Sequence, residues 1–212
     1  MSPRLTRAQQ AGRNRALVLA AARRVFLARG YHGATLEQIA DAAGFSKGVV
    51  YSQFRGKADL FLALLENRIE ERAQQNARLA RDAAGGGLTA LLDHLIQVDK
   101  ATREWLLLVI EFRVHAARDP GLNQRYAAAH ARSVEAVATA LAIISERAGG
   151  QFPLPLHQLA ELLMALSTGG ALEEAAHPGS LETPHVAGLL ATLLEPAALA
   201  TPAGTPAGSS LP

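Results

Sequence analysis

The side chains best equipped to bind another molecule lie in the stretch Thr35–Lys57, which reads TLEQIADAAGFSKGVVYSQFRGK. Its second half carries an ammonium group, a carboxamide and hydroxyl groups but, from position 46 to 53, no carboxylate. A surface that approaches nucleic-acid phosphates needs this freedom from negative charge. Lysine can donate to guanine, glutamine can pair with adenine, and valine can contact a thymine methyl group. The stretch therefore predicts contact with double-stranded DNA through its outward residues, Lys47, Gly48, Val49, Tyr51, Ser52 and Gln53.

Two short helices would position these residues. Thr35 is a good helix N-cap, and Gln38, three residues later, completes a capping box. Gly44 can adopt the positive φ that reverses the chain, and Ser46 can cap a second helix. Two helices joined by such a turn form a helix-turn-helix. The apolar positions at helical spacing, expected to be buried, are Leu36, Ile39, Ala40 and Ala43 in the first helix and Val50 and Phe54 in the second.

The charge of the chain is divided unevenly. Residues 1–57 hold ten Lys and Arg but only two acids, Glu37 and Asp41, which gives this part a formal charge of +8. Residues 58–212 hold eleven basic and seventeen acidic residues, a charge of −6. A basic N-terminal end can be merely a solvated face or a loose tail. Because it coincides here with the helix-turn-helix, a module that binds a polyanion is the better interpretation.

The stretch also carries a family signature, Gly-x-Ser-x-Gly-x-x-Tyr-x-x-Phe-x-x-Lys, complete at Gly44, Ser46, Gly48, Tyr51, Phe54 and Lys57. On this signature, residues 13–66 resemble the DNA-binding end of the TetR family of bacterial transcription regulators. Over the rest of the chain the resemblance is only architectural. It implies a regulator, most commonly a repressor, that binds a palindromic operator as a homodimer and responds to a small molecule.

The resemblance supports specific roles within the stretch. The second helix would lie in the major groove, where Lys47, Val49 and Gln53 contact bases and Gly48 lets the backbone approach closely. Ser52 and Gln53 stand at positions that vary within the family, so no base preference carries over. In a symmetric dimer the two reading helices would lie about 34 Å apart. The expected phosphate contacts are Thr35, Ser46, Tyr51 and Lys57.

Composition predicts an all-α fold, because Ala and Leu dominate while Val, Ile and aromatic residues are scarce. We expect an N-terminal helix-turn-helix DNA-binding domain and a C-terminal helical domain for ligand binding and dimerisation. The expected divisions are a flexible basic arm (1–12, with Arg4 and Arg7 as possible DNA contacts), the three-helix DNA-binding domain (13–57), a connecting helix (58–84), the C-terminal domain (85–195) and a disordered tail (196–212). The expected helices outside the helix-turn-helix span residues 13–29, 57–83, 88–100, 102–118, 122–147, 156–174 and 184–195.

The last two expected helices are apolar almost all round, so both sides of each helix need to be covered. One side can be covered by a second subunit, as in the resembled family, where the final two helices of each chain form a four-helix bundle. The alternative is that both helices lie at the centre of a monomer. The expected interface residues are Leu159, Leu162, Leu163, Leu166, Val186, Leu189, Leu190 and Leu193.

A ligand cavity among the helices of residues 88–147 is implied by the resemblance alone, since no motif marks it. The candidate lining is Trp105, Leu108, Phe112, His115 and Tyr126, with His94 and Arg113 as polar anchors. Each of these residues can equally be ordinary core or surface. The sequence leaves the identity of the effector open, and no cofactor or metal is expected.

An enzyme is the main alternative class. Glu111 and His115 stand four residues apart, and Glu174 with His177 forms a Glu-x-x-His pair. A di-iron bundle needs two such pairs and two further glutamates, and neither a Ser/His/Asp arrangement nor a dinucleotide fingerprint is evident. The triple glycine at residues 85–87 has no Lys-Ser/Thr pair after it, so it indicates a linker.

Two further alternatives keep DNA binding: an architectural protein without a ligand, and an activator in place of a repressor. The chain has no cysteine, and no uninterrupted apolar run reaches the roughly 18 residues of a membrane span. We therefore expect a cytoplasmic protein with no membrane partner.

Overall fold

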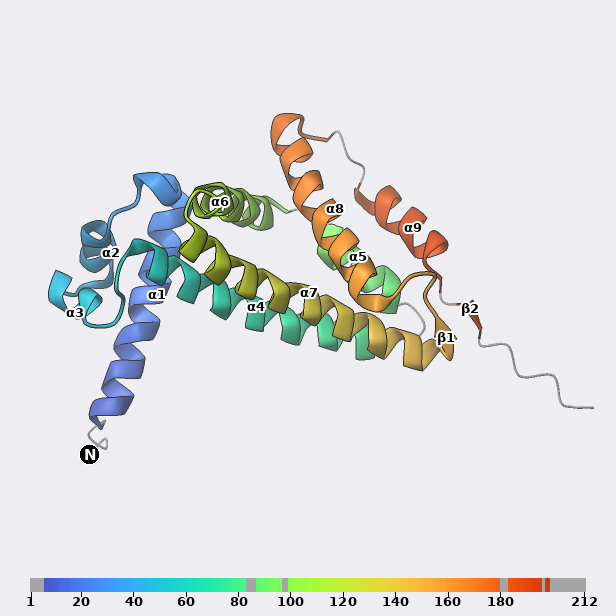
Figure 1. The fold of residues 1–212 in the computed structure, drawn as a ribbon, viewed down its shortest axis with the longest axis horizontal. Coiled ribbons are helices and arrows are strands. Elements are labelled where there is room, and N and C mark those ends of the chain that lie inside the picture. The colour runs from blue at the N-terminus through green and yellow to red at the C-terminus, as the bar shows by residue number, and fades with distance from the viewer. Residues whose placement is uncertain (1–5, 83–86, 97–98, 180–182, 196, 199–212) are drawn as a thin grey trace, which may run out of the picture.

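The computed structural model describes residues 6–82, 87–96, 99–179, 183–195 and 197–198. Apart from one pair of two-residue strands, every element in these ranges is a helix, which confirms the all-α prediction. The elements, shown in Figure 1, are α1 (Arg7–Gly33), α2 (Leu36–Ala43), α3 (Lys47–Tyr51), α4 (Lys57–Asp82), α5 (Gly87–Ile96), α6 (Lys100–Ala116), α7 (Pro120–Ala148), β1 (Gly150–Gln151), α8 (Leu156–Ala176), α9 (Thr183–Leu193) and β2 (Ala197–Ala198).

The helix-turn-helix forms as the sequence predicts. Thr35 and Gln38 exchange both bonds of the capping box, and Gly44 ends α2 with φ 73°, its N–H donating to the carbonyls of Ala40 and Asp41. The side chains of Val50 and Phe54 are fully buried behind α3. Ser46 takes the N-cap position of α3, but its side chain makes no capping hydrogen bond, so that expectation is wrong.

The first helix begins earlier than expected. Thr6 Oγ1 accepts from the Gln9 N–H at 3.2 Å, and Gln9 Oε1 accepts from the Thr6 N–H at 2.9 Å, which is a second capping box. The flexible arm predicted over residues 1–12 is therefore wrong from Thr6 onward, while Arg4 lies outside the described residues. Nor does the helix end at Gly30, where the chain kinks with φ 71° and continues for one more turn to Gly33.

The structure differs from the sequence-based expectation at two further places. The helix expected at 88–100 ends at Ile96, and the next begins at Lys100 because the Asp99 carboxylate caps it, accepting from the Thr102 N–H at 2.7 Å. In the tail predicted to be disordered, Ala197 and Ala198 pair antiparallel with Gln151 and Gly150. A backbone ladder needs no large apolar side chains. Residues 196 and 199–212 lie outside the described residues.

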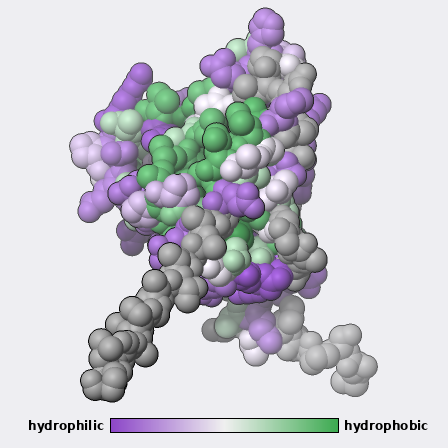
Figure 2. All heavy atoms as spheres, turned by 90° about the vertical axis from the view of Figure 1, so that its right-hand side faces the viewer, coloured by the Kyte–Doolittle hydropathy of each residue, from purple (hydrophilic) through white to green (hydrophobic). Residues whose placement is uncertain are grey.

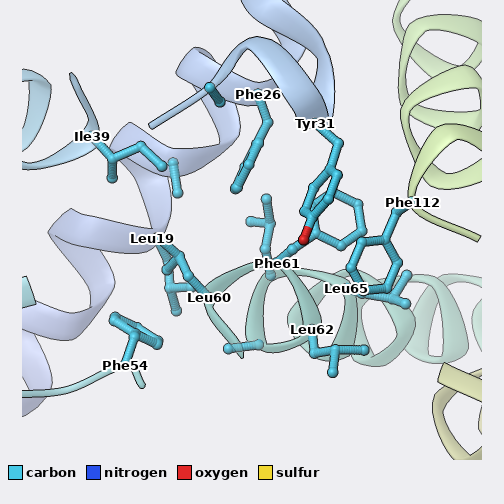
Figure 3. Close-up of a cluster of buried hydrophobic side chains, with 14 of the residues drawn as sticks. Leu19, Phe26, Tyr31, Ile39, Phe54, Leu60, Phe61, Leu62, Leu65 and Phe112 are labelled. Carbon is cyan, nitrogen blue, oxygen red and sulfur yellow. The ribbon is translucent and has the colours of Figure 1, made fainter. Parts of the chain in front are cut away.

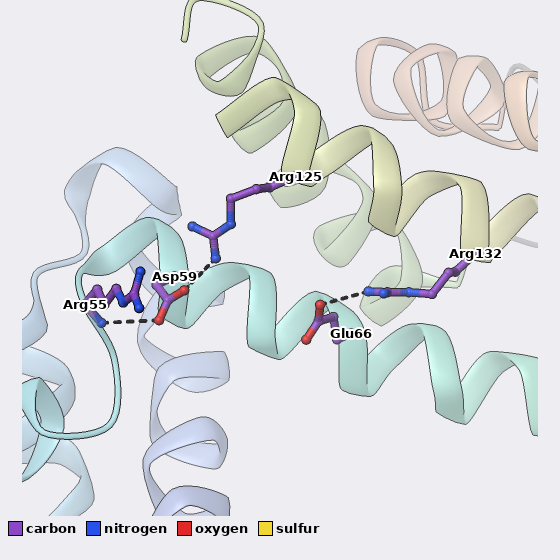
Figure 4. A network of polar contacts seen from close by, with 5 residues as sticks. All are labelled: Arg55, Asp59, Glu66, Arg125 and Arg132. Atoms are coloured by element: carbon purple, nitrogen blue, oxygen red, sulfur yellow. Dashed lines mark hydrogen bonds and ion pairs between the residues drawn. The ribbon is translucent and has the colours of Figure 1, made fainter. Parts of the chain in front are cut away.

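The long helices α4 and α7 run side by side and form the axis of the molecule (Figure 1). Two ion pairs cross between them: Arg125 with Asp59, and Arg132 with Glu66 at 2.8 Å (Figure 4). Asp59 also accepts from the Arg55 N–H at 3.2 Å and so fixes the start of α4. By length and composition α7 could cross a membrane, but its apolar side chains contribute to both hydrophobic cores of the protein.

The first core joins the two halves of the chain. The Phe61 ring of α4 stacks on Phe112 of α6 at 4.3 Å between centroids and meets Phe26 of α1 edge-on at 5.3 Å (Figure 3). Tyr31 packs edge-on against Phe112 at 5.0 Å. The first turns of α4 therefore belong to the core of the DNA-binding half, although the expected domain division assigned residues 58–84 to a connecting helix. A second core lies among α5, α7, α8 and α9.

Hydrogen bonds from Glu111 and Lys57, here called the polar clamp, hold the turn where the two halves of the chain meet. The Glu111 carboxylate of α6 accepts from the backbone N–H groups of Tyr31 and His32, at 2.9 and 3.0 Å. It sits over Gly30, where an added Cβ would lie 2.8 Å from Glu111 Oε2. From α4, Lys57 Nζ donates to the His32 and Ala34 carbonyls at 3.2 and 3.0 Å. The turn after the kink is thus held from both sides.

We predict that Glu111→Gln lowers the free energy of unfolding by about 1–3 kcal/mol. The amide keeps one acceptor oxygen, and its NH2 group would face a backbone N–H. Glu104→Gln is the matched control, because Glu104 is exposed on the same helix and, among the described residues, forms an ion pair only with Lys100, at 4.0 Å. That control should change stability by less than about 0.5 kcal/mol. Urea unfolding followed by circular dichroism measures both; equal effects would contradict the clamp.

Candidate functional site

Helix α3 presents a polar exposed side above a buried anchor. Ser46, Lys47, Gly48, Tyr51 and Ser52 are exposed. Thr35, at the start of α2, is exposed as well, while Val49 and Gln53 are half-buried. The structure therefore gathers the predicted DNA-binding residues other than Lys57 on α3, its flanking residues and the start of α2.

Lys47 has an acidic neighbour that the sequence analysis missed. Its Nζ lies 3.2 Å from Oε1 of Glu37, on the first turn of α2. The backbone N–H of Glu37 and the Lys47 ammonium both lower the pKa of this carboxylate, so it stays ionised and competes with a phosphate for Lys47. Glu37 was visible in the sequence as one of two acids in the basic half, but its contact with Lys47 depends on how α2 and α3 cross.

Two predicted contact residues have part of their hydrogen-bonding capacity already in use, and a third has a buried acceptor without a partner. The Thr35 hydroxyl accepts from the Gln38 N–H, and the Ser52 hydroxyl donates to the Val49 carbonyl at 2.8 Å. Gln53 Oε1 is buried without a hydrogen-bond partner among the described residues. Base reading by Gln53 remains a prediction that requires its carboxamide to turn outward.

Lys57 has a structural role in the clamp. Its ammonium binds two backbone carbonyls and lies 4.7 Å from the centroid of the Tyr31 ring. Burial lowers the pKa of Lys57, and the Glu111 carboxylate opposes that shift. One of its three N–H groups remains for a phosphate, so phosphate contact by Lys57 also remains a prediction.

Arginines of α1 brace the helix-turn-helix from behind. The Arg15 guanidinium lies 4.5 Å from the centroid of the Phe54 ring, and Arg24 donates to the Ala42 carbonyl at 3.1 Å. Phe54 follows α3, and Ala42 is in the last turn of α2. The positive charge of this half therefore also helps to fix the two helices.

The residues predicted for a subunit interface separate into three groups. Leu159 and Leu163 are each only 2% exposed in the second core of their own chain, so their assignment to the interface is wrong. Val186 and Leu190 are half-buried against the same core. Four leucines are largely exposed on α8 and α9, where Figure 2 shows hydrophobic side chains gathered on that end of the molecule: Leu162 (57%), Leu166 (42%), Leu189 (61%) and Leu193 (64%).

A cavity of about 110 Å³ lies among α4, α6, α7 and α8. Of the predicted lining, Trp105, Arg113 and Tyr126 contribute to it. The other predicted residues do not line it: Leu108 and Phe112 belong to the first core, and His115 packs against Tyr31 and His32.

His94 is also outside the lining, and burial, then Arg72 and Arg68, lower its pKa to about 4. Its backbone carbonyl accepts from Arg72 at 3.2 Å.

Most of the polar residues that line the cavity were not predicted from the sequence. Arg68, Arg72 and Asn76 come from α4, His130 and Ser133 from α7, and Ser167 and Thr168 from α8.

The carboxylates of the enzymatic alternative have other roles. Glu111 belongs to the clamp, and Glu174 lies 3.6 Å from Arg103 and accepts from the Gly179 N–H at 2.9 Å. In the ranges that the structure describes, no group of three His, Asp or Glu side chains is arranged to hold a metal ion.

Comparison with known proteins agrees with this architecture. Residues 18–64 match the family model described as bacterial regulatory proteins, tetR family, and residues 85–198 match that of the BetI-type transcriptional repressor, C-terminal. The HTH-type transcriptional repressor AcnR of Corynebacterium efficiens is 28% identical over 74% of this chain and 83% of its own length. The HTH-type transcriptional activator FasR of Mycolicibacterium smegmatis is 46% identical over 26% of each chain.

Among solved structures, a TetR-family regulator from Rhodococcus sp. superimposes with a TM-score of 0.70 at 25% identity, covering 85% of this chain and 98% of that one. The match to the C-terminal family model covers more than half of the chain, and the N-terminal model covers the helix-turn-helix. The chain therefore belongs to the TetR family of bacterial transcriptional regulators.

Proposed function

We propose that this protein represses transcription as a homodimer: two copies of α3 read a palindromic operator, and a small molecule in the cavity releases it. The observation that carries the proposal is the exposed side of α3, which has no acid of its own and belongs to a half with a formal charge of +8. Family membership supports the regulatory role. Because FasR is named an activator and AcnR a repressor, the direction of regulation is part of the proposal.

Rigid presentation of α3 supports DNA reading. Val50 and Phe54 anchor its inner side, and the Arg15 guanidinium covers the Phe54 ring. A reading helix needs such support because base contacts depend on placement within fractions of an ångström. Lys47 and Tyr51 then extend from a fixed base, and the Glu37 carboxylate sets how readily Lys47 reaches the duplex.

The exposed leucines support a dimer through α8 and α9. Leu162 and Leu166 stand four residues apart on α8, as do Leu189 and Leu193 on α9, so each pair lies on one helix face. Contiguous exposed apolar surface of this kind marks an interaction site. A second copy would cover it with the same four leucines, because the interface of a two-fold dimer is self-complementary.

Helix α6 supports coupling between effector and DNA. It lines the cavity with Trp105, Leu106 and Arg113, while its Glu111 holds the turn that leads into α2. An effector that fits one position of α6 better than another would shift the dimer toward that state, because a ligand acts only through its differential affinity. In this proposal α6 acts together with α4 in joining the two halves.

The DNA-binding part of the proposal is tested by two substitutions in one ion pair. After an operator is selected from random duplexes, Lys47→Ala should weaken its binding by about 1–3 kcal/mol and reduce the salt slope by about one. Glu37→Gln should act in the opposite direction, because it releases Lys47 and removes a charge that repels phosphates. Gel shifts over a salt series measure both.

The matched control for Glu37→Gln is Asp41→Asn, which makes the same charge change on α2 away from Lys47. We expect it to tighten binding less than Glu37→Gln. Unchanged affinity in Lys47→Ala would remove Lys47 from the interface. Absence of any enriched sequence in the selection would contradict operator binding itself.

The dimer is tested by adding charge to the leucine face. The double substitution Leu189→Arg, Leu193→Arg should convert the protein to a monomer in sedimentation-velocity runs, because it places four like charges in a two-fold interface. Leu154→Arg, at a residue 39% exposed in the segment before α8, should leave the dimer intact. A monomeric parent protein, or a dimeric double variant, would refute this interface.

A further inference from the structure

Two of the three arginines that line the cavity lie on one wall, and the third, Arg113 of α6, is exposed to solvent. Arg68, Arg72 and Asn76 stand at successive four-residue intervals on α4, so their side chains lie along one face of that helix. The remaining walls are largely apolar. They include Trp105, Leu106, Val109 and Ile110 of α6, Val137 of α7 and Met164 of α8.

Arg72 is the main unbalanced charge on that wall. Its guanidinium donates to the His94 carbonyl at 3.2 Å, and no carboxylate of the described residues lies within ion-pair distance of it. Burial, then the neighbouring Arg68, lower the pKa of Arg72 to about 10, and the Asp99 carboxylate opposes this shift from beyond ion-pair distance, so Arg72 remains charged at neutral pH. A partly buried charge without a directly paired counter-ion is unfavourable.

The acids around Arg72 are already engaged elsewhere. Glu71 pairs with Arg68 NH1 at 3.3 Å, and Asp99 caps α6 by accepting from the Thr102 N–H. The positive charge on this wall therefore exceeds the negative charge available to it.

Two further polar atoms of α4 have no partner in the described part of the chain. Arg68 Nε and Asn76 Oδ1 are both buried without a hydrogen bond, and Asn76 is only 2% exposed. The hydroxyls of Ser167 and Thr168 on the opposite side already donate to the Leu95 and Met164 carbonyls. Among the described lining residues, the buried side-chain atoms that lack a hydrogen-bond partner therefore lie on α4.

We propose that this cavity binds an amphipathic monocarboxylate. Its carboxylate accepts hydrogen bonds from the Arg72 guanidinium and Arg68 Nε, and its apolar part lies along Trp105, Val109 and Met164. The planar guanidinium matches a carboxylate with two parallel hydrogen bonds. One singly charged group balances Arg72, because Arg68 already has Glu71 as a partner. A cationic ligand would be repelled.

The size of the cavity limits the apolar part. Its volume of about 110 Å³ is comparable with the engineered cavity of about 150 Å³ that admits benzene. A short aliphatic or an aromatic acid therefore fits with little movement, whereas a longer chain requires α6 or α8 to shift. Only the consequence for DNA, release by the acid, rests on the proposed function; binding of the acid does not.

The experiment uses the full chain and its one tryptophan, Trp105, which lines the cavity. Tryptophan fluorescence is titrated with straight-chain carboxylates of four to ten carbons and with phenylacetate. For each chain length, the matched alcohol, amine and alkyl phosphate are the comparison ligands. We expect saturable binding of at least one carboxylate, at least tenfold weaker binding of its alcohol, and no binding of its amine.

Arg72→Gln should weaken carboxylate binding at least tenfold and leave binding of the alcohol unchanged. Because it removes a partly buried charge that has no ion-pair partner and keeps an amide that can donate to the His94 carbonyl, it should not lower the melting temperature of the ligand-free protein. Arg78→Gln is the control, since Arg78 lies on the same helix, exposed and outside the cavity lining. It should bind the carboxylate as the parent protein does.

Several outcomes would overturn the inference: no carboxylate binds, the alcohol binds as tightly as the acid, the phosphate binds in place of the acid, or Arg72→Gln binds normally. A gel shift with the selected operator, with and without the best carboxylate, separates this inference from the proposed function. Binding of the acid without release of DNA would support the ligand class and refute the effector role. DNA binding by a protein that binds no carboxylate would refute the ligand class and support operator binding.

Discussion

The aromatic core centred on Phe61 connects the DNA-binding half to the helices that surround the cavity. Phe61 contacts Phe26 of α1 on one side and Phe112 of α6 on the other, and its ring also stacks on Trp105 at 6.2 Å. Aromatic pairs add directional preference to the burial of apolar area. The orientation of α2 and α3 relative to the rest of the chain therefore depends on rings whose positions are fixed by three different helices.

The polar clamp adds directional hydrogen bonds to the aromatic contacts between the two halves of the chain. Glu111 and Lys57 hold the turn after Gly30 through backbone atoms, so their contacts depend on the path of the chain and not on which side chains the turn carries. Since α6 supplies both Glu111 and part of the cavity wall, the same rigid helix touches both functional regions. A packed core of this kind transmits small displacements because it has little free volume to absorb them.

Local patterns in the sequence predicted the parts of the fold that depend on local interactions. The Thr35–Gln38 capping box, the turn at Gly44 and the burial of Phe54 follow from spacing and residue type, and all three are present. Assignments that depend on tertiary contacts were less successful. A helix that is apolar all round does not reveal which leucines face inward, so Leu159 could not be distinguished from Leu162. Residues 58–84 were expected only as a connecting helix, yet Asn76 is buried because α4 is one wall of the cavity.

In the proposed dimer, the pairing of β1 with β2 bears on how fast two copies associate. Backbone bonds from Gly150 and Gln151 to Ala198 and Ala197 fasten the chain beyond α9 to the connection that leads into α8. The leucine faces of both helices are thus arranged before any partner arrives. Association through them requires no segment to fold, which limits its entropic cost to rigid-body and side-chain freedom. For such a preorganised surface, the encounter rate is set by diffusion and orientation, and the strength of the contact is expressed mainly in the lifetime of the pair.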